Sequence, residues 1–394
     1  MDFLPFFILI AAAVLFSAIF NKFHLPWVIA LIVSGMVIGP HGLELLEINP
    51  TVQLMSQMGL VFLMFMAGLE VRLSTFKDFR LGLARFAFLS AGIPATVGIT
   101  IGLLLGFELI AAVLLGIIFM SSSIAVIIPT LESGNLLNQK LGKTIVAATI
   151  VVDIASLIAL SLLLQFINPN TGLPVWSFLI LFTIIIAGYR YAAPRIRSLF
   201  PVRRDERDLF ESEVRIVLTL LFGTVITFAA LGLHPIIAGF FAGLILSDII
   251  NSEILTEKLR TIGYGIFIPI FFVTVGAETN IAAVFTSATA VILSLIIVIG
   301  SVASKVFSGF LAMRLDGFSV HNSLVAGIAT TPQLSTTLAV VFTAVELALV
   351  PESLIGAMVI LTMVTTLGAP LILKYLFDHP EVTLPAVGVD TNSV

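Results

Sequence analysis

Long apolar runs dominate this sequence and restrict its fold more than any other feature. Thirteen of them follow one another along the 394 residues, and the connections between them are mostly short. A helix needs about 20 apolar residues to cross the ~30 Å hydrocarbon core of a bilayer. We therefore predict thirteen transmembrane helices, at approximately 3–20, 26–43, 54–71, 83–105, 109–131, 142–167, 175–194, 211–232, 234–250, 261–277, 283–313, 319–345 and 353–376.

Composition excludes a water-soluble protein. Hydrophobic residues make up 59% of the chain, charged residues make up 11%, and the mean hydropathy is +1.17. Soluble domains carry about 25% charged residues. The chain has no cysteine, so disulfides and thiol catalysis are excluded. Walker A, HExxH and GxGxxG motifs are absent, so we expect no cofactor and no nucleic-acid partner. The predicted class is an all-α polytopic membrane protein.

Positive charge is restricted to one side of the predicted membrane. With the N-terminus outside, every Lys and Arg except Lys305 falls in a cytoplasmic connection or just inside the span beside it. The outside connections carry acids such as Glu108 and Glu278 instead. Connections rich in Lys and Arg stay in the cytoplasm as a rule. We expect a cell inner membrane protein with its N-terminus outside and its C-terminus in the cytoplasm.

Short similarities recur seven spans apart. The second span begins LPW at Leu25 and the ninth begins HPI at His234, while the third span resembles the tenth. An odd offset reverses direction across the membrane, and inverted repeats are typical of secondary transporters. We predict one transmembrane domain, 1–378, with inverted six-helix repeats at 1–168 and 209–378, a connector helix with its basic tail at 175–207, and a cytoplasmic tail at 379–394.

The fifth and twelfth spans share this offset, and hydroxyl residues and a proline interrupt both. The fifth span reads SSSIAVIIPT from Ser121, and the twelfth reads TTPQLSTT from Thr330. Proline removes a helical hydrogen bond, and interrupted helices at matching positions of two repeats indicate a substrate site. We predict two broken helices that cross near the membrane midplane. The residues of the predicted crossing are Ser121, Pro129, Thr130, Thr331, Pro332 and Gln333.

Two charges lie deep in the predicted spans. Asp153 is ten residues from the nearest cytoplasmic lysine, or ~15 Å along a helix, and Lys305 is nine residues from the nearest cytoplasmic arginine, or ~13.5 Å. A lone charge at the membrane centre costs at least ~2.5 kcal/mol and indicates a functional site by default. An inert salt bridge is the alternative, but an apolar pair would join two helices without the desolvation penalty.

We interpret Asp153 as a carboxylate that binds a proton and a monovalent cation in turn. Thr149 and Ser156 lie on the same helix face as Asp153, and oxygens of the broken helices would replace the hydration shell of the ion. The carrier would change face only when the carboxylate is neutralised. The predicted function is cation/proton exchange, with Na+ favoured and K+ next, and with no enzymatic activity.

Taken together, several segments resemble the monovalent cation:proton antiporter superfamily, in its second branch of Kef-type carriers and Na+/H+ exchangers. The resemblance covers nearly the whole chain and is carried by Lys305 and by the segments LPWVIALIVSGMVIGPHGL, FLMFMAGLE, SSSIAVIIPTLESGNL and IPIFFVTVGAETN. It implies thirteen helices in a lipid bilayer and a homodimer formed through a dimerisation domain. It also implies a mobile core domain whose broken helices cross beside the carboxylate.

Position by position, the resemblance implies that Asp153 binds the ion and the proton and that Lys305 is its coupling and salt-bridge partner. Ser122 and Ser123 would be the hydroxyl groups beside the ion. Family members have Asn, Asp or Gln immediately before the aspartate, whereas this chain has Val152, which removes one ligand. We expect no appended nucleotide-binding domain, because the sequence ends soon after the last predicted span.

Two other functions remain open. A sodium-coupled symporter of a small organic anion could use a similar fold, but it would need a second sodium site. A cation channel would need rings of like charge or a carbonyl filter. An intramembrane enzyme would need a second catalytic acid or metal ligands at depth, and the sequence provides neither.

The predicted orientation can be tested by cysteine labelling, because the chain has no native cysteine. Asp205 lies in the basic segment that we place in the cytoplasm, so Asp205→Cys should resist an impermeant maleimide added to intact cells. Labelling should become rapid once the cells are permeabilised. Equally rapid labelling in sealed cells would refute the orientation.

Overall fold

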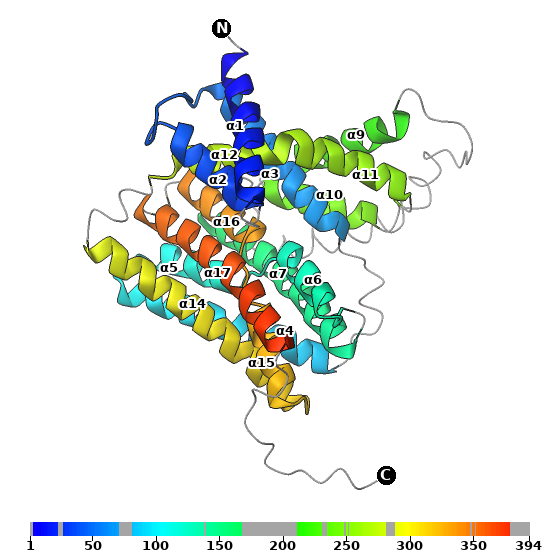
Figure 1. Cartoon of the computed structure of the whole chain (residues 1–394), viewed down its shortest axis with the longest axis vertical. Coiled ribbons are helices and arrows are strands. Elements are labelled where there is room, and N and C mark those ends of the chain that lie inside the picture. Colours follow the sequence, from blue (N-terminus) through cyan, green and yellow to red (C-terminus); the bar gives the residue numbers. More distant parts are fainter. Residues whose placement is uncertain are drawn as a thin grey trace. The chain divides into compact units, whose positions relative to one another are not determined.

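In the computed structural model, all the regular secondary structure of the described residues is helical (Figure 1). These residues are 3–22, 27–70, 81–137, 139–167, 211–230, 235–247, 250, 252–280, 288–346, 349–350 and 352–378. The first half contains α1 (Leu4–Asn21), α2 (Trp27–Ile38), α3 (Pro50–Glu70), α4 (Leu81–Leu104), α5 (Leu109–Met120), α6 (Ile124–Ser133) and α7 (Lys140–Ile167). The second half contains α9 (Ser212–Ala230), α10 (Pro235–Ser247), α11 (Glu253–Ile262), η2 (Gly263–Phe267), α12 (Ile268–Glu278), α14 (Ala288–Leu315), α15 (Val320–Ala329), α16 (Ser335–Glu346) and α17 (Glu352–Asp378).

The helices follow the apolar runs because a backbone in lipid must satisfy its hydrogen bonds internally. Within the described residues, eight helical segments are long and apolar enough to cross a membrane. Each of the predicted runs coincides with a helix or with a pair of helices, except 175–194, which lies outside the described residues. The fifth run is divided into α5 and α6, and the twelfth is divided into α15 and α16.

The predicted start of the tenth span, at residue 261, was wrong. The helix begins eight residues earlier as α11, whose first turn is capped by the Ser252 hydroxyl at 3.2 Å from the Leu255 amide. It then continues through the π-helical segment η2 into α12. A hydropathy count missed this start because α11 carries Glu253, Glu257, Lys258 and Arg260.

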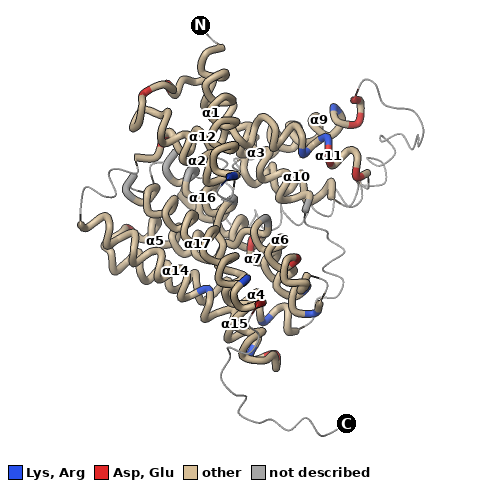
Figure 2. The backbone as a smooth tube through the Cα atoms, in the orientation of Figure 1, with Lys and Arg blue, Asp and Glu red and all other residues tan. Residues whose placement is uncertain are grey.

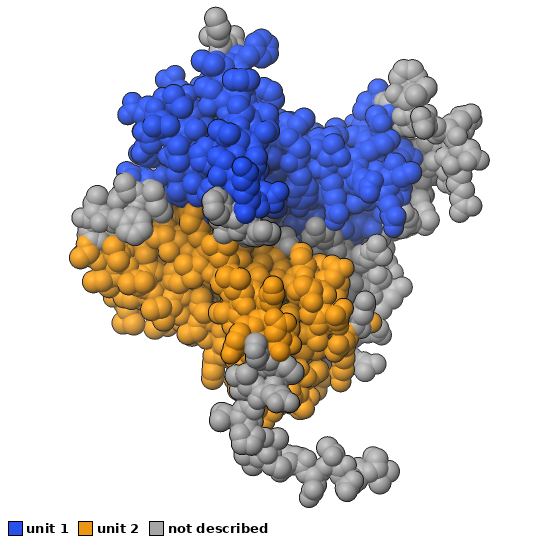
Figure 3. Space-filling model, in the orientation of Figure 1, with its two compact units in different colours: residues 1–78, 157–282 blue, residues 79–156, 283–394 orange. Residues whose placement is uncertain are grey.

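The chain forms two compact units, each built from two separate stretches of sequence (Figure 3). Unit 1 contains Met1–Asp78 and Leu157–Ala282, and unit 2 contains Phe79–Ser156 and Ala283–Val394. Unit 1 therefore has α1 to α3 and α9 to α12, together with the end of α7. Unit 2 has α4 to α6, most of α7, and α14 to α17, so both divided helices belong to it.

Glycine allows the closest helix contacts in unit 1. A Cβ atom at Gly35 of α2 would collide with the Val273 carbonyl of α12, and one at Gly243 of α10 would collide with the Phe65 carbonyl of α3. Small residues let membrane helices approach until their backbones touch. The result is a reciprocal pattern, because the second predicted span packs on the tenth and the ninth packs on the third.

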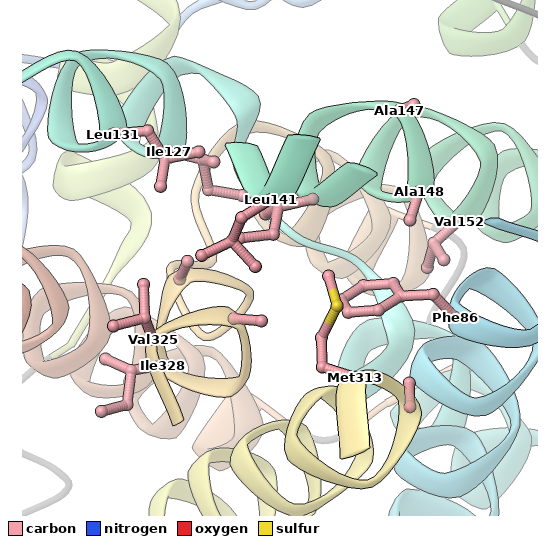
Figure 4. Close-up of a cluster of buried hydrophobic side chains, with 14 of the residues drawn as sticks. Phe86, Ile127, Leu131, Leu141, Ala147, Ala148, Val152, Met313, Val325 and Ile328 are labelled. Carbon is pink, nitrogen blue, oxygen red and sulfur yellow. The ribbon is translucent and has the colours of Figure 1, made fainter. Parts of the chain in front are cut away.

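A continuous apolar cluster holds several helices of unit 2 together. It includes Phe86 of α4, Leu141 and Val152 of α7, Met313 of α14 and Val325 of α15, all at least nine-tenths buried (Figure 4). These side chains come from α4, α7, α14 and α15, and Figure 4 shows them in a close-up of the cluster. The cluster therefore fixes α7 and α14, the two helices that carry the buried charges, against the same packed interior.

The outer surface of the helices is apolar. Large side chains such as Leu81 and Phe88 of α4, Phe7 of α1 and Ile299 of α14 are mostly exposed. Figure 2 shows that most of the described backbone carries neither acid nor base. Soluble monomers rarely expose contiguous apolar patches of more than a few hundred Å². These side chains accordingly face lipid in a multi-pass membrane protein.

We predict that Gly35→Ala destabilises unit 1, because its Cβ would lie 2.7 Å from the Ala277 nitrogen as well as against the Val273 carbonyl. Overpacking of this kind costs about 1–3 kcal/mol, so the thermal midpoint of the purified protein should fall. Gly223→Ala in α9 is the matched control, since its Cβ would meet no atom within 4 Å. Equal midpoints for the two variants would contradict the packing argument.

Candidate functional site: two helix breaks and two buried charges

Two short extended segments interrupt helices in unit 2. Residues 121–123 separate α5 from α6, and residues 330–334 separate α15 from α16. The second break contains Pro332, and a residue that precedes proline is disfavoured in the helical conformation. In the first break, Ser121 and Ser123 have extended backbone angles, with ψ of 155° and 105°. Hydroxyl side chains favour such positions because they can bond to nearby backbone groups.

The two breaks are bonded to one another. The Ser123 amide donates to the Pro332 carbonyl at 2.7 Å. The Ser122 hydroxyl donates at 2.8 Å to the carbonyl of Thr330, and Thr330 is the C-cap residue of α15. Ser121 Oγ and Thr337 Oγ1 are 2.7 Å apart. These bonds satisfy backbone groups that would otherwise be left unpaired in the membrane.

Two residues of the predicted crossing do not lie in the breaks. Pro129 and Thr130 are inside α6, and the Thr130 hydroxyl donates to the Val126 carbonyl of its own helix. Proline costs that helix one hydrogen bond without ending it. Ser121, Thr331, Pro332 and Gln333 do lie in the two breaks.

Asp153 lies where α7 passes the first break. Its carboxyl group is buried, with 7% of the residue exposed, and Oδ1 accepts a hydrogen bond from the Ser122 amide at 3.0 Å. This amide precedes the N-terminus of α6, the end at which helix dipoles favour negative charge. A carboxylate here is therefore stabilised by a backbone donor and by the half-helix that follows.

Lys305 of α14 lies on the other side of the same break, where α5 ends. It is fully buried, and its Nζ donates to the Met120 carbonyl at 2.7 Å and to Ser122 Oγ. Met120 is the last residue of α5, and cations are stabilised at helix C-termini. The interrupted helix thus presents its negative end to the lysine and its positive end to the aspartate.

Asp153 and Lys305 interact through Ser122, whereas the sequence suggested a direct salt bridge. The Ser122 amide bonds the carboxylate and the Ser122 hydroxyl bonds the ammonium. The two charges are close enough to interact electrostatically, but no ion pair joins them. A serine between two charges was not predictable from span counting, because it depends on how the break turns.

The four hydroxyls expected beside the ion divide into two groups. Ser122 uses its hydroxyl on Thr330 and Lys305, and Ser156 donates to the Asp153 carbonyl of its own helix at 2.8 Å. Ser123 Oγ and Thr149 Oγ1 are buried and have no hydrogen-bond partner. A buried hydroxyl without a partner is costly. Ser123 and Thr149 are consequently the hydroxyls with oxygen available to a ligand.

Val152 lies in the apolar cluster near Phe86 and Met313 (Figure 4). Its side chain is 2% exposed. The sequence suggested that valine at this position removes an ion ligand. In the structure, a polar side chain at position 152 would instead place a donor or acceptor among hydrocarbon groups, which is unfavourable without a partner.

The chemistry of this site suits one small cation of single charge. In the part of the chain that the structure describes, no three His, Asp or Glu residues gather as a metal cluster. Divalent cations such as Ca2+ take six to eight oxygen ligands, commonly from several carboxylates. The single carboxylate can neutralise one proton or one monovalent cation, the neutral hydroxyls can supply further oxygens, and the nearby ammonium disfavours any additional positive charge.

Comparison with known proteins gives a family match, two related proteins and one similar solved structure. The family described as sodium/hydrogen exchanger, transmembrane, matches residues 8–379. The probable Na(+)/H(+) antiporter 3 of Methanocaldococcus jannaschii is 32% identical over 378 residues, which cover 94% of this chain and 96% of that protein. The Na(+)/H(+)-K(+) antiporter GerN of Bacillus cereus is 27% identical over 92% of each chain. The solved structure of the sodium proton antiporter MjNhaP1 from Methanocaldococcus jannaschii has a similar fold, with a TM-score of 0.65, 16% identity, and coverage of 94% of this chain and 95% of that one.

Proposed function

This chain belongs to the sodium/hydrogen exchanger transmembrane family, and on that premise we propose that it exchanges Na+ or K+ for protons at the Asp153 carboxylate. The observation that carries the proposal is the first helix break of unit 2. There, a buried carboxylate and a buried ammonium are held by the same serine, with two unpaired hydroxyls in the same region. Such a site can bind a proton or a cation, and it cannot hold both well.

Exchange follows from this competition. A buried carboxylate is costly to move through the membrane while it is charged. Either a proton or a monovalent cation neutralises it, so the loaded forms can change the side to which the site opens. Ser123 and Thr149 supply the oxygen that replaces part of the hydration shell of the cation. Na+ is favoured and K+ is next, in keeping with relatives named for Na+ and, in one case, for both ions.

The arrangement of the repeats supports alternating access around this site. In unit 1 the second span packs on the tenth and the third packs on the ninth, as two inverted halves would require. Unit 2 contains both interrupted helices and corresponds to the mobile core domain, and unit 1 corresponds to the dimerisation domain of a homodimer. Thirteen crossings, with the N-terminus outside and the C-terminus in the cytoplasm of a cell with an inner membrane, complete the proposed topology.

We predict that Asp153→Asn abolishes cation-driven proton movement. The asparagine amide has nearly the same shape but is neutral at every pH, so it can neither release a proton nor balance a cation. Proton flux should be measured in liposomes that contain the purified variant, after separate additions of Na+, K+ and Li+. The three ions also give the selectivity of the wild-type protein.

Ser156→Ala is the matched control for this measurement. Ser156 lies three residues from Asp153 on α7, but its hydroxyl bonds its own helix. This variant should therefore exchange at the wild-type rate. Cation-dependent proton flux that persists in Asp153→Asn would reject Asp153 as the exchange site.

We predict that exchange is one for one and insensitive to voltage. The Lys305 ammonium donates to Met120 O and Ser122 Oγ, so a cation that arrives at Asp153 breaks no direct contact with the lysine. Lys305 can then keep its proton through the cycle. Moving one charge across the membrane changes the free energy by about 2.3 kcal/mol per 100 mV. The exchange rate in liposomes with a clamped potential therefore distinguishes one-for-one exchange from exchange that moves net charge. A rate that scales with the imposed voltage would show that Lys305 also releases a proton.

A further inference from the structure

Gln333 links the two helix breaks through its side chain. It lies in the second break and is fully buried. Its Nε2 donates to Ser301 Oγ of α14 at 3.0 Å and to the Phe119 carbonyl of α5 at 3.4 Å. Its backbone is held by α17, because the Gln333 amide donates to Thr365 Oγ1 at 3.2 Å. Gln333 is therefore held through its backbone and through Nε2, while its Oε1 is buried without a hydrogen-bond partner.

Both side-chain partners of Gln333 adjoin Lys305. Phe119 directly precedes Met120, whose carbonyl accepts from the Lys305 ammonium. Ser301 is four residues before Lys305, which places the two side chains on the same face of α14. Two successive carbonyls at the end of α5 thus receive donors from different parts of unit 2, one from Gln333 in the second break and one from Lys305 of α14.

Gln333 and Lys305 each bond a different carbonyl of α5, and this matters because an ammonium has three N–H donors and could bond both. Lys305 uses two of them, on Met120 O and Ser122 Oγ. If Gln333 did not occupy the Phe119 carbonyl, that buried acceptor would lack a partner beside a cation with an N–H to supply. The ammonium would then be drawn along α5 and away from Ser122, which is its link to Asp153.

We propose that Gln333 is a positioning residue that fixes the Lys305 ammonium on Ser122 by occupying the neighbouring Phe119 carbonyl. Gln333 thereby sets how strongly Lys305 opposes proton binding by Asp153. The inference rests on the proposed exchange at Asp153 and adds to it the residue that tunes its pH dependence. Nothing in the mechanism requires Gln333 to contact the ion.

The electrostatic surroundings of Lys305 are simple enough for this test. The charge that interacts with it is Asp153. Arg85 is paired with Asp316 at 2.8 Å. Among residues whose side chains the structure describes, the other ionisable groups on helices that pack against α14 or contact α5 are near helix ends, namely Glu108, His321, Lys374, Tyr375 and Asp378.

The test compares the pH dependence of exchange in liposomes for the full-length protein. Lys305→Gln removes the ammonium, so Asp153 binds protons more tightly and the pH of half-maximal rate should rise by about one unit. Gln333→Met keeps the length of the side chain and removes its N–H donors. We expect a rise in the same direction by part of that amount, with the maximal rate largely retained.

Two comparisons separate this role from simple structural support. In the Lys305→Gln background, Gln333→Met should produce no further change, because Gln333 acts through the lysine. Thr337→Val is the matched control: it removes the bond to Ser121 in the same crossing but touches neither Lys305 nor its carbonyls. The pH of half-maximal rate should stay at the wild-type value in this control.

The outcomes distinguish the inference from the function beneath it. An unchanged pH dependence in Gln333→Met, or an equal change in Thr337→Val, would overturn the role of Gln333 while exchange at Asp153 stands. Exchange that survives Asp153→Asn would overturn both. If Gln333→Met fails to fold, Ser301→Ala replaces it, since it removes one anchor of the amide. A smaller rise in the same direction is expected, and no rise would reject the proposal.

Discussion

Interrupting a helix inside a membrane leaves backbone N–H and C=O groups without their helical hydrogen bonds, and lipid offers no replacement. The buried polar side chains at the breaks of unit 2 form the replacement bonds. Each missing helical bond has to be replaced from another part of the protein. The Ser123 amide uses the Pro332 carbonyl, and the Ser122 amide uses Asp153. The Met120 carbonyl uses Lys305. The groups that we assign to ion exchange are therefore also the groups that complete the backbone at the first break.

The second break is completed in the same manner with neutral groups. Thr365 of α17 accepts from the Gln333 amide, as Asp153 of α7 accepts from the Ser122 amide. The side chains of Ser122 and Gln333 each reach a carbonyl at the end of the other interrupted helix. Two related arrangements thus differ mainly in charge. Under the exchange that we propose, titration and cation binding would act on the first break, whereas the second has no charged group in these bonds.

Much of this architecture was predictable from the sequence for a simple physical reason. A bilayer requires long apolar runs, so the helices and the depths of Asp153 and Lys305 follow from counting residues. The start of α11 at Glu253 was missed because charged residues such as Glu253 and Arg260 lower the hydropathy of this helix. Its N-cap residue is Ser252. Whether two inverted repeats and thirteen crossings complete the fold stays a prediction, since residues 168–210 lie outside the described part.

The details of the candidate site could not be derived in this way. Ser121 and Pro332 were expected at the crossing and lie in the breaks, but Pro129 lies inside α6 because one lost hydrogen bond does not end a helix. The bridging position of Ser122 and the reach of Gln333 depend on contacts between residues about 200 positions apart. No local pattern encodes such contacts. For Gln333, the one hint in the sequence was that a polar residue directly follows Pro332.

The serine between the two charges has a consequence for turnover. Breaking a buried ion pair by removing one partner costs about 3–5 kcal/mol, so a direct Asp153–Lys305 pair would compete strongly with any cation. Here the carboxylate is held by a backbone amide and the ammonium by neutral oxygens. A cation can therefore approach Asp153 without first separating two bonded charges. The ammonium still interacts with the carboxylate electrostatically, so the two charges are coupled without being bonded to one another.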